Sequence, residues 1–333
     1  MKPADTSLVS KPDVDERRGG ARLSLILGHS WLGALVAALL LWALAGAITG
    51  TLSVSFLLAN ATIAGFLALA GAAQMTVIAS GSGNFDLSLP YVVTFSAYVM
   101  SAGFLGDGNV LGSLFLTLAA GAVVGAVNAL LIVRLRIPAI VATLATGYII
   151  YSLIVAIQSA GFNRVGGSLE ALLRLRFWGI SGALVVTGVT LLLLAIVLGR
   201  SVYGLRLHAM GQSAEAARLA GVRLGWATLW TFMISGVLAA WLGILLATYQ
   251  GGVSADLGRS YLLGSVAAVV VGGTRIAGGV TSIVGTALGA LVLTLAQSDL
   301  MLLRFGIGAQ YVIQGLIVLV TVSLVAVRTR HLR

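Results

Sequence analysis

Asp86 is one of only 10 acidic residues in the chain, and it lies in a polar stretch, 79–90, between apolar segments. A carboxylate at membrane depth costs about 2.5–3.5 kcal/mol, so we expect it to face a cavity or a hydrogen-bond donor. Asn84 and Ser88 are donors nearby in the sequence. This chemistry suits a polar transport path. The alternative is that Asp86 lies at the membrane surface and caps the helix that follows it.

A second glycine-rich interruption, 271–280, contains Arg275. Both interruptions lie beside segments that are too short or too polar to be comfortable membrane spans. Unwound backbone at membrane depth is tolerated only where protein or water satisfies its polar groups, so such breaks point to a substrate path. Thr143 is a polar group on an apolar segment, and it either bonds to a neighbouring helix or lines the same path.

The most polar stretch inside the chain is 200–224. Ser213 suits a helix N-cap, Glu215 lies in the first turn, and Arg218 lies near the end before Gly221. This pattern predicts a short surface helix. The small residues Ala216, Ala217 and Ala220 leave little bulk, so a partner protein can approach closely. The alternative is an ordinary loop between membrane helices.

Several kinds of chemistry are excluded by residue types that the chain lacks. Lysine occurs only at positions 2 and 11, so there is no phosphate-binding loop that ends in Gly-Lys-Ser/Thr. There is no cysteine, and His29, His208 and His331 are too scattered to propose a metal site. No catalytic group or cofactor is predicted, and any energy from ATP must come from a partner.

The composition indicates a polytopic membrane protein. Apolar residues make up 59% of the chain and charged residues 9%, against roughly a quarter charged in soluble domains. The net charge of +10 sits at the ends of apolar runs instead of forming a basic face, so nucleic acid is not an expected partner.

Apolar runs long enough to cross a core of about 30 Å as helices recur along the chain. We predict an all-α bundle of about ten spans, at 31–50, 56–80, 90–103, 111–133, 139–158, 182–198, 226–248, 261–271, 280–297 and 310–327. The eighth is short enough to be broken or re-entrant, and the boundaries near 80–110 and 261–280 stay open. The expected organisation is a tail at 1–29, a membrane domain at 30–327 that includes the loop 200–224, and a tail at 328–333.

The basic residues orient these spans. An even number of spans puts both termini on one side of the membrane. If that side is the cytoplasm, fifteen of the 20 Lys and Arg residues are cytoplasmic, as the positive-inside rule requires. The loop 200–224 and both tails are then cytoplasmic.

Four motifs resemble the permease subunits of bacterial ABC importers of the ribose, xylose and arabinose type, and the likeness extends over about 60–321. Gly83-Asn-Phe-Asp-Leu-Ser88 looks like the family's Gly-Gly-Ile-Asp-Leu-Ser signature. Arg136-Ile-Pro-Ala-Ile-Val-Ala-Thr-Leu144 resembles the start of one of its spans, and 204–221 resembles its cytoplasmic loop. Ala267-Ala-Val-Val-Val-Gly-Gly-Thr274 matches its late Gly-Gly-Thr segment.

The resemblance implies a multi-pass inner-membrane subunit that imports a monosaccharide. Its partners are two ATPase subunits, a second permease subunit, a periplasmic binding protein and membrane lipid. The residues predicted for ATPase coupling are Gly211, Ser213, Glu215, Ala216, Ala217, Arg218 and Gly221, of which Gly211, Ala216, Ala217 and Gly221 match the family's loop. The residues predicted for the translocation path are Asn84, Phe85, Asp86, Leu87, Ser88, Thr143, Gly272, Gly273 and Thr274, of which Asp86, Leu87 and Ser88 match the family's signature.

The chain departs from the family pattern in two places, of which the first concerns the coupling loop and the second the substrate. Ser213 replaces the usual asparagine of the loop, and Leu89-Pro90 follows the first signature where Val-Gly is usual. Import of branched-chain amino acids or nucleosides stays open within the superfamily. A self-contained secondary transporter or channel is the alternative from another class.

Overall fold

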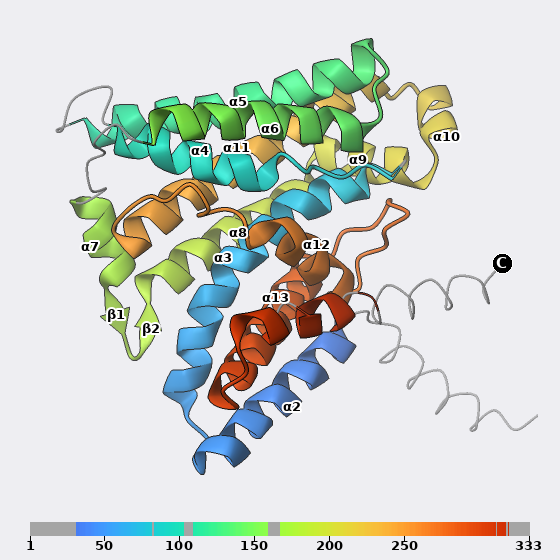
Figure 1. The fold of residues 1–333 in the computed structure, drawn as a ribbon. Coiled ribbons are helices and arrows are strands. Elements are labelled where there is room, and N and C mark those ends of the chain that lie inside the picture. Colours follow the sequence, from blue (N-terminus) through green and yellow to red (C-terminus); the bar gives the residue numbers. More distant parts are fainter. Residues whose placement is uncertain are drawn as a thin grey trace, which may run out of the picture.

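The computed structural model describes residues 31–81, 83–102, 109–158, 167–310, 312–317 and 319. Within these residues the fold is a bundle of α-helices with a single two-stranded hairpin (Figure 1). The all-α prediction is confirmed. The two predicted tails, 1–29 and 328–333, lie outside the described residues.

Seven helices of the described part are long and apolar enough to cross a membrane, and each overlaps a predicted span. This agreement follows from the length of the apolar runs, because a helix rises about 1.5 Å per residue. They are α2 (Leu32–Thr49), α3 (Val54–Ala79), α5 (Val110–Arg134), α6 (Ala139–Ile157), α8 (Gly182–Arg200), α11 (Leu224–Gln250) and α13 (Ile283–Leu302).

Two further apolar helices are too short to span a bilayer. α4 (Leu89–Ser101) has 13 residues and α12 (Tyr261–Val271) has 11. They are about 20 Å and 17 Å long, against a hydrocarbon core of about 30 Å. The sequence predicted a short eighth span, and the structure shows that the third is also short. A third short apolar helix, Ile307–Ile317, runs over a residue outside the described part and overlaps the start of the predicted tenth span.

Helices α3 and α11 form the centre of the bundle. The most apolar windows of α3 and α11 are 61% and 67% buried, whereas that of α2 is 17% buried. α11 packs along α5, α4 and α3, and α3 also packs against α13, α12 and α8 (Figure 1). The outer helices therefore leave apolar faces for lipid, and the two interrupted helices, α4 and α12, lie against the central pair.

Glycine allows α5 and α11 to pack closely. A Cβ atom on Gly121 would overlap the carbonyl oxygen of Gly236, and one on Gly125 would overlap the carbonyl oxygen of Phe232. Ala129, one turn further along α5, is also buried. The four-residue spacing of small side chains therefore marks a helix-packing face, as the sequence indicated.

The two ends of the bundle carry different small elements (Figure 1). One end has α7 (Ser168–Arg174), where Arg174 pairs with Glu170 at 2.9 Å, and an antiparallel hairpin of β1 (Arg176–Phe177) and β2 (Ile180–Ser181). The opposite end has α9 (Val202–Gln212) and α10 (Ala214–Leu219). The loop 200–224 thus lies at the end of the bundle opposite α7 and the hairpin (Figure 1).

Candidate functional site

The surface helix α10 has the caps that the sequence predicted. The hydroxyl oxygen of Ser213 accepts a hydrogen bond from the N–H of Ala216 at 3.2 Å. At the other end, the N–H of Val222 donates to the carbonyl of Ala217 and that of Gly221 to the carbonyl of Arg218. This is the Schellman pattern, in which Gly221 takes a left-handed φ of 84°. The helix therefore ends sharply and turns back toward α11.

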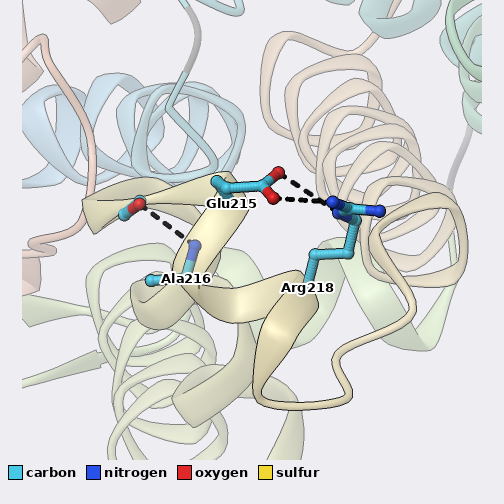
Figure 2. A network of polar contacts seen from close by, with 4 residues as sticks. Glu215, Ala216 and Arg218 are labelled. Atoms are coloured by element: carbon cyan, nitrogen blue, oxygen red, sulfur yellow. Dashed lines mark hydrogen bonds and ion pairs between the residues drawn. The ribbon is translucent and has the colours of Figure 1, made fainter.

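Charged and apolar side chains cover the free face of α10. Arg218 donates to both carboxylate oxygens of Glu215, at 2.6 and 3.2 Å, and the two side chains point toward each other along one face (Figure 2). Leu219 is 78% exposed beside them. Leu219 was not predicted from the sequence as part of this surface, and a single exposed leucine is not by itself a sign of a protein contact.

Two residues predicted to contact a partner point inward instead. Ala217 is 3% exposed and packs beneath α10. Gly211, at the end of α9, lies against the main chain of the bundle: a Cβ atom there would overlap the carbonyl oxygen of Ala79 and the amide nitrogen of Gly279. These two residues position the surface helix and leave Ser213, Glu215, Ala216 and Arg218 on its exposed part.

Gly211 joins three segments that are far apart in the sequence. Gly81 follows α3 in the first glycine-rich interruption, and its added Cβ would lie 3.0 Å from the Cα of Gly211. Gly279 belongs to the second interruption, and its N–H donates to the carbonyl of Ala79 at 2.9 Å. We name this contact of Ala79, Gly81, Gly211 and Gly279 the glycine junction. It connects the α9–α10 segment directly to both interruptions.

A polar contact supports the glycine junction from the side. The Nε2 atom of His208 on α9 and the hydroxyl of Thr281 are 2.9 Å apart. Burial lowers the pKa of His208 below its ordinary value of 6.5.

This shift gives a pH prediction for the stability of the protein. The folded state holds the His208 proton less readily than the unfolded chain, so stability is complete above about pH 6.5 and falls as the pH drops through the lowered folded value. We expect the thermal midpoint of the protein in detergent to fall between about pH 7.5 and about pH 5.5. The fall should be smaller in His208→Gln, which keeps a donor toward Thr281. Identical pH profiles for both proteins would contradict this assignment.

Asp86 is buried inside the bundle, at 3% exposure, and its carboxylate accepts a backbone hydrogen bond at the start of α4. One carboxylate oxygen accepts from the N–H of Ser88 at 3.0 Å and from its hydroxyl at 2.5 Å. The other accepts from the hydroxyl of Ser235 on α11 at 2.9 Å. The side-chain amide of Asn128 on α5 donates to the Ser88 hydroxyl at 2.8 Å. Asp86 thus connects the start of α4 to α11 directly and, through Ser88, to α5.

The other residues of the first interruption are also held by protein groups. The hydroxyl of Thr143 on α6 accepts from the N–H of Leu87 at 3.0 Å and lies 3.3 Å from the carbonyl of Phe85. The amide of Asn84 donates to the hydroxyl of Ser80 at 2.9 Å. The structure therefore brings Asn84, Phe85, Asp86, Leu87, Ser88 and Thr143 together as one packed cluster that fixes where α4 begins.

The second interruption packs against α13. A Cβ atom on Gly272 would overlap the backbone of Gly285, so close helix packing requires glycine here. Gly273 adopts a left-handed φ of 81°, and Thr274 is buried with a hydroxyl that has no partner within the described residues. Gly272, Gly273 and Thr274 lie apart from the cluster of Asp86.

A cavity of about 250 Å³ lies where the two short helices begin. Its lining comes from the first two turns of α4, from α6, and from the connection into α12. The lining residues are Pro90, Tyr91, Thr94, Tyr148, Tyr151, Ala255, Asp256, Arg259 and Leu262. We name it the tyrosine cavity. This cavity was not predicted from the sequence, although Tyr148 and Tyr151 are three residues apart and therefore share one face of a helix.

The tyrosine cavity is held open by specific contacts. The ring of Tyr91 lies 5.9 Å from the rings of both Tyr148 and Tyr151. The N–H of Gly258 donates to the hydroxyl of Thr94 at 3.0 Å, and a Cβ atom on Gly258 would overlap the carbonyl oxygen of Pro90. These contacts bring the connection before α12 against the first turns of α4. A cavity with an aromatic wall, lined also by Asp256 and Arg259, results between two helices that are each too short for a full span.

Comparison with known proteins points to one family. Residues 53–322 match the family model described as branched-chain amino acid transport system / permease component. The chain is 31% identical over 237 residues to proteins described as autoinducer 2 import system permease protein LsrC, from Yersinia pestis (strain Pestoides F) and Yersinia pseudotuberculosis serotype O:3 (strain YPIII). The aligned region covers 71% of this chain and 68% of each relative. No solved structure matches the chain.

Proposed function

Because this chain belongs to the family of branched-chain amino acid transport system permease components, we propose that it is the translocation subunit of an importer driven by separate ATPase subunits. It works with a second permease subunit and receives its substrate from a periplasmic binding protein. The subunit crosses the inner membrane several times, with both termini, the tails 1–29 and 328–333, and the loop 200–224 in the cytoplasm.

The observation that carries this proposal is the glycine junction. α10 exposes Glu215, Arg218 and Leu219 at one end of the bundle, where a motor protein has access. The preceding helix, α9, contacts both interruptions through Gly211 without any intervening side chain. A displacement of α10 by the ATPase is therefore transmitted through α9 to both interruptions by contacts between main-chain atoms. These contacts are stiff because packed protein interiors compress little.

A monosaccharide is the substrate that we propose. The Asp-Leu-Ser signature at 86–88 favours a sugar, and the relatives named above import autoinducer 2, whereas the family model is described by branched-chain amino acids. A branched-chain amino acid or a nucleoside is the competing substrate class. Uptake of radiolabelled pentoses, hexoses, nucleosides and leucine by cells that carry the complete importer separates these classes.

A self-contained carrier or channel is the competing function of another class. It needs no protein contact at α10, so charge changes there should leave its transport unaffected. The exposed ion pairs at the two ends of the bundle offer a matched test. Arg218 is 62% exposed and paired with Glu215, and Arg174 is 56% exposed and paired with Glu170.

We expect Arg218→Glu to reduce the amount of copurified ATPase subunit and the rate of uptake about tenfold, which corresponds to a loss of about 1.4 kcal/mol at the interface. Arg174→Glu should leave copurification unchanged, because α7 lies at the opposite end. Exposed ion pairs add little to stability, so both variants should fold normally. An ATPase subunit that copurifies equally with both variants, or with neither variant nor the wild type, would contradict a motor contact at α10.

A further inference from the structure

We propose that the tyrosine cavity is a binding site for the transported substrate, and that it takes a small, neutral, polyhydroxylated molecule such as a monosaccharide. This inference rests on the proposed function for the direction of transport. We assign substrate binding to Tyr91, Tyr148 and Tyr151, together with Asp256 and Arg259, and not to the cluster of Asp86.

The shape of the cavity favours a small ligand. Its volume of about 250 Å³ is below the roughly 300–1,000 Å³ that is usual for drug-sized ligands. It also lies where two helices begin after an interruption, α4 at Leu89 and α12 at Tyr261. Broken helices whose ends converge at one place are the usual architecture of a substrate site in membrane transporters.

The chemistry of the lining favours hydroxyl groups over separate charges. Three tyrosine rings offer flat faces with negative potential, against which the C–H groups of a sugar ring pack, and each ring adds one hydroxyl. Asp256 and Arg259 are 3.5 Å apart and neutralise each other. A free amino acid needs an unpaired cation and an unpaired anion, whereas a sugar needs donors and acceptors, which this pair supplies.

The open side of the cavity supports a water-filled path. Tyr148 and Tyr151 are 57% and 37% exposed, and the side chains of Asp256 and Arg259 are 67% and 81% exposed. Charged side chains as exposed as these face water or protein and not lipid, because exposure to lipid is costly. The open side of the cavity is therefore accessible to water or to a partner subunit, as entry of a polar substrate requires.

The absence of cysteine from the chain allows a direct test. Leu262→Cys introduces a single thiol into the cavity lining, and Phe115→Cys introduces one on α5 at a position that is 76% exposed and outside the cavity lining. Both proteins are assembled with their ATPase subunits and binding protein and treated with N-ethylmaleimide. The probes present during modification are ribose, xylose, arabinose, glucose and leucine.

We expect the sugar that the wild type transports to slow modification of Leu262→Cys and to leave Phe115→Cys unaffected. Adding Tyr148→Ala or Tyr151→Ala should raise the protecting sugar concentration about tenfold, the effect of losing roughly one aromatic contact. Phe115→Ala, which removes an exposed aromatic ring elsewhere, should not change it. A purely structural role for the tyrosines predicts no protection at all.

Two results distinguish this inference from the proposed function. If the wild type transports a sugar and that sugar does not protect Leu262→Cys, the assignment of the cavity is wrong while the importer remains. If leucine is transported and no sugar is, the proposed substrate class is wrong, and protection of Leu262→Cys by leucine would overturn the polyhydroxylated ligand assigned to the cavity.

Discussion

Gly211→Ala should reduce uptake to below about one tenth of the wild-type rate while the protein still reaches the membrane. The smallest possible side chain at this position already overlaps the Ala79 carbonyl and the Gly279 amide. Backbone atoms cannot rotate out of the way as a side chain can, so overpacking of this kind costs roughly 1–3 kcal/mol and displaces α9. Because α9 leads directly into α10, the displacement misaligns the surface that we propose the ATPase subunits contact.

Gly199→Ala is the matched control for this prediction. Gly199 lies in the last turn of α8, close in sequence to the same loop, and an added Cβ atom there meets no atom within 4 Å. Alanine favours a helix over glycine by about 1 kcal/mol, so this variant should be as stable as the wild type or more so. Uptake measured in cells, normalised to the amount of protein in the membrane, compares the two. Full uptake by Gly211→Ala would show that the glycine junction does not transmit the motion.

Asp86→Ala should lower the thermal stability of the protein by several kcal/mol. The change leaves the hydroxyls of Ser88 and Ser235 and the N–H of Ser88 without their acceptor in a buried site. A buried donor without a partner costs roughly 1–3 kcal/mol. At about 2–4 °C per kcal/mol, the midpoint in detergent should fall by roughly 5–10 °C.

Two further variants distinguish a structural role of Asp86, which holds α4 against α11, from a role in the transport path. Asp86→Asn keeps one acceptor oxygen, and Ser235→Ala removes a single donor, so both should cost less than Asp86→Ala. If Asp86 has the structural role, uptake and stability should fall in the same order across the three variants. A stable Asp86→Ala protein that has lost uptake would instead assign Asp86 to the path.

A short segment of chain connects the glycine junction to the tyrosine cavity. α3 contacts Gly211 through its final residue, Ala79, and the connection after it leads through the cluster of Asp86 to α4. The first turns of α4 then line the cavity. In the importer that we propose, this connection is the route by which movement of α9 would reach the cavity, and hydrogen bonds to α5, α6 and α11 hold it in place.

Features that depend on neighbouring residues were predictable from the sequence. Ser213 caps α10 because its hydroxyl reaches an N–H only three residues later, and Gly221 ends the helix because it tolerates a positive φ. The membrane spans follow from the length of apolar runs. The helix α9 was missed because residues 202–212 mix polar and small side chains without a clear apolar stripe, and its packing on the bundle is what defines it.

The amino-acid sequence by itself determined the membrane class of this protein, its long helices and the surface helix α10, because periodicity, run length and capping act over a few residues. Only the tertiary structure decided what the polar residues do. Asp86 holds the start of α4 against α11, because the fold brings the hydroxyl of Ser235, 149 positions away in the sequence, to its carboxylate. The fold also brings Tyr91, Tyr148 and Arg259 to one cavity. Contacts between such distant segments depend on complementary packing, which a local sequence pattern does not reveal.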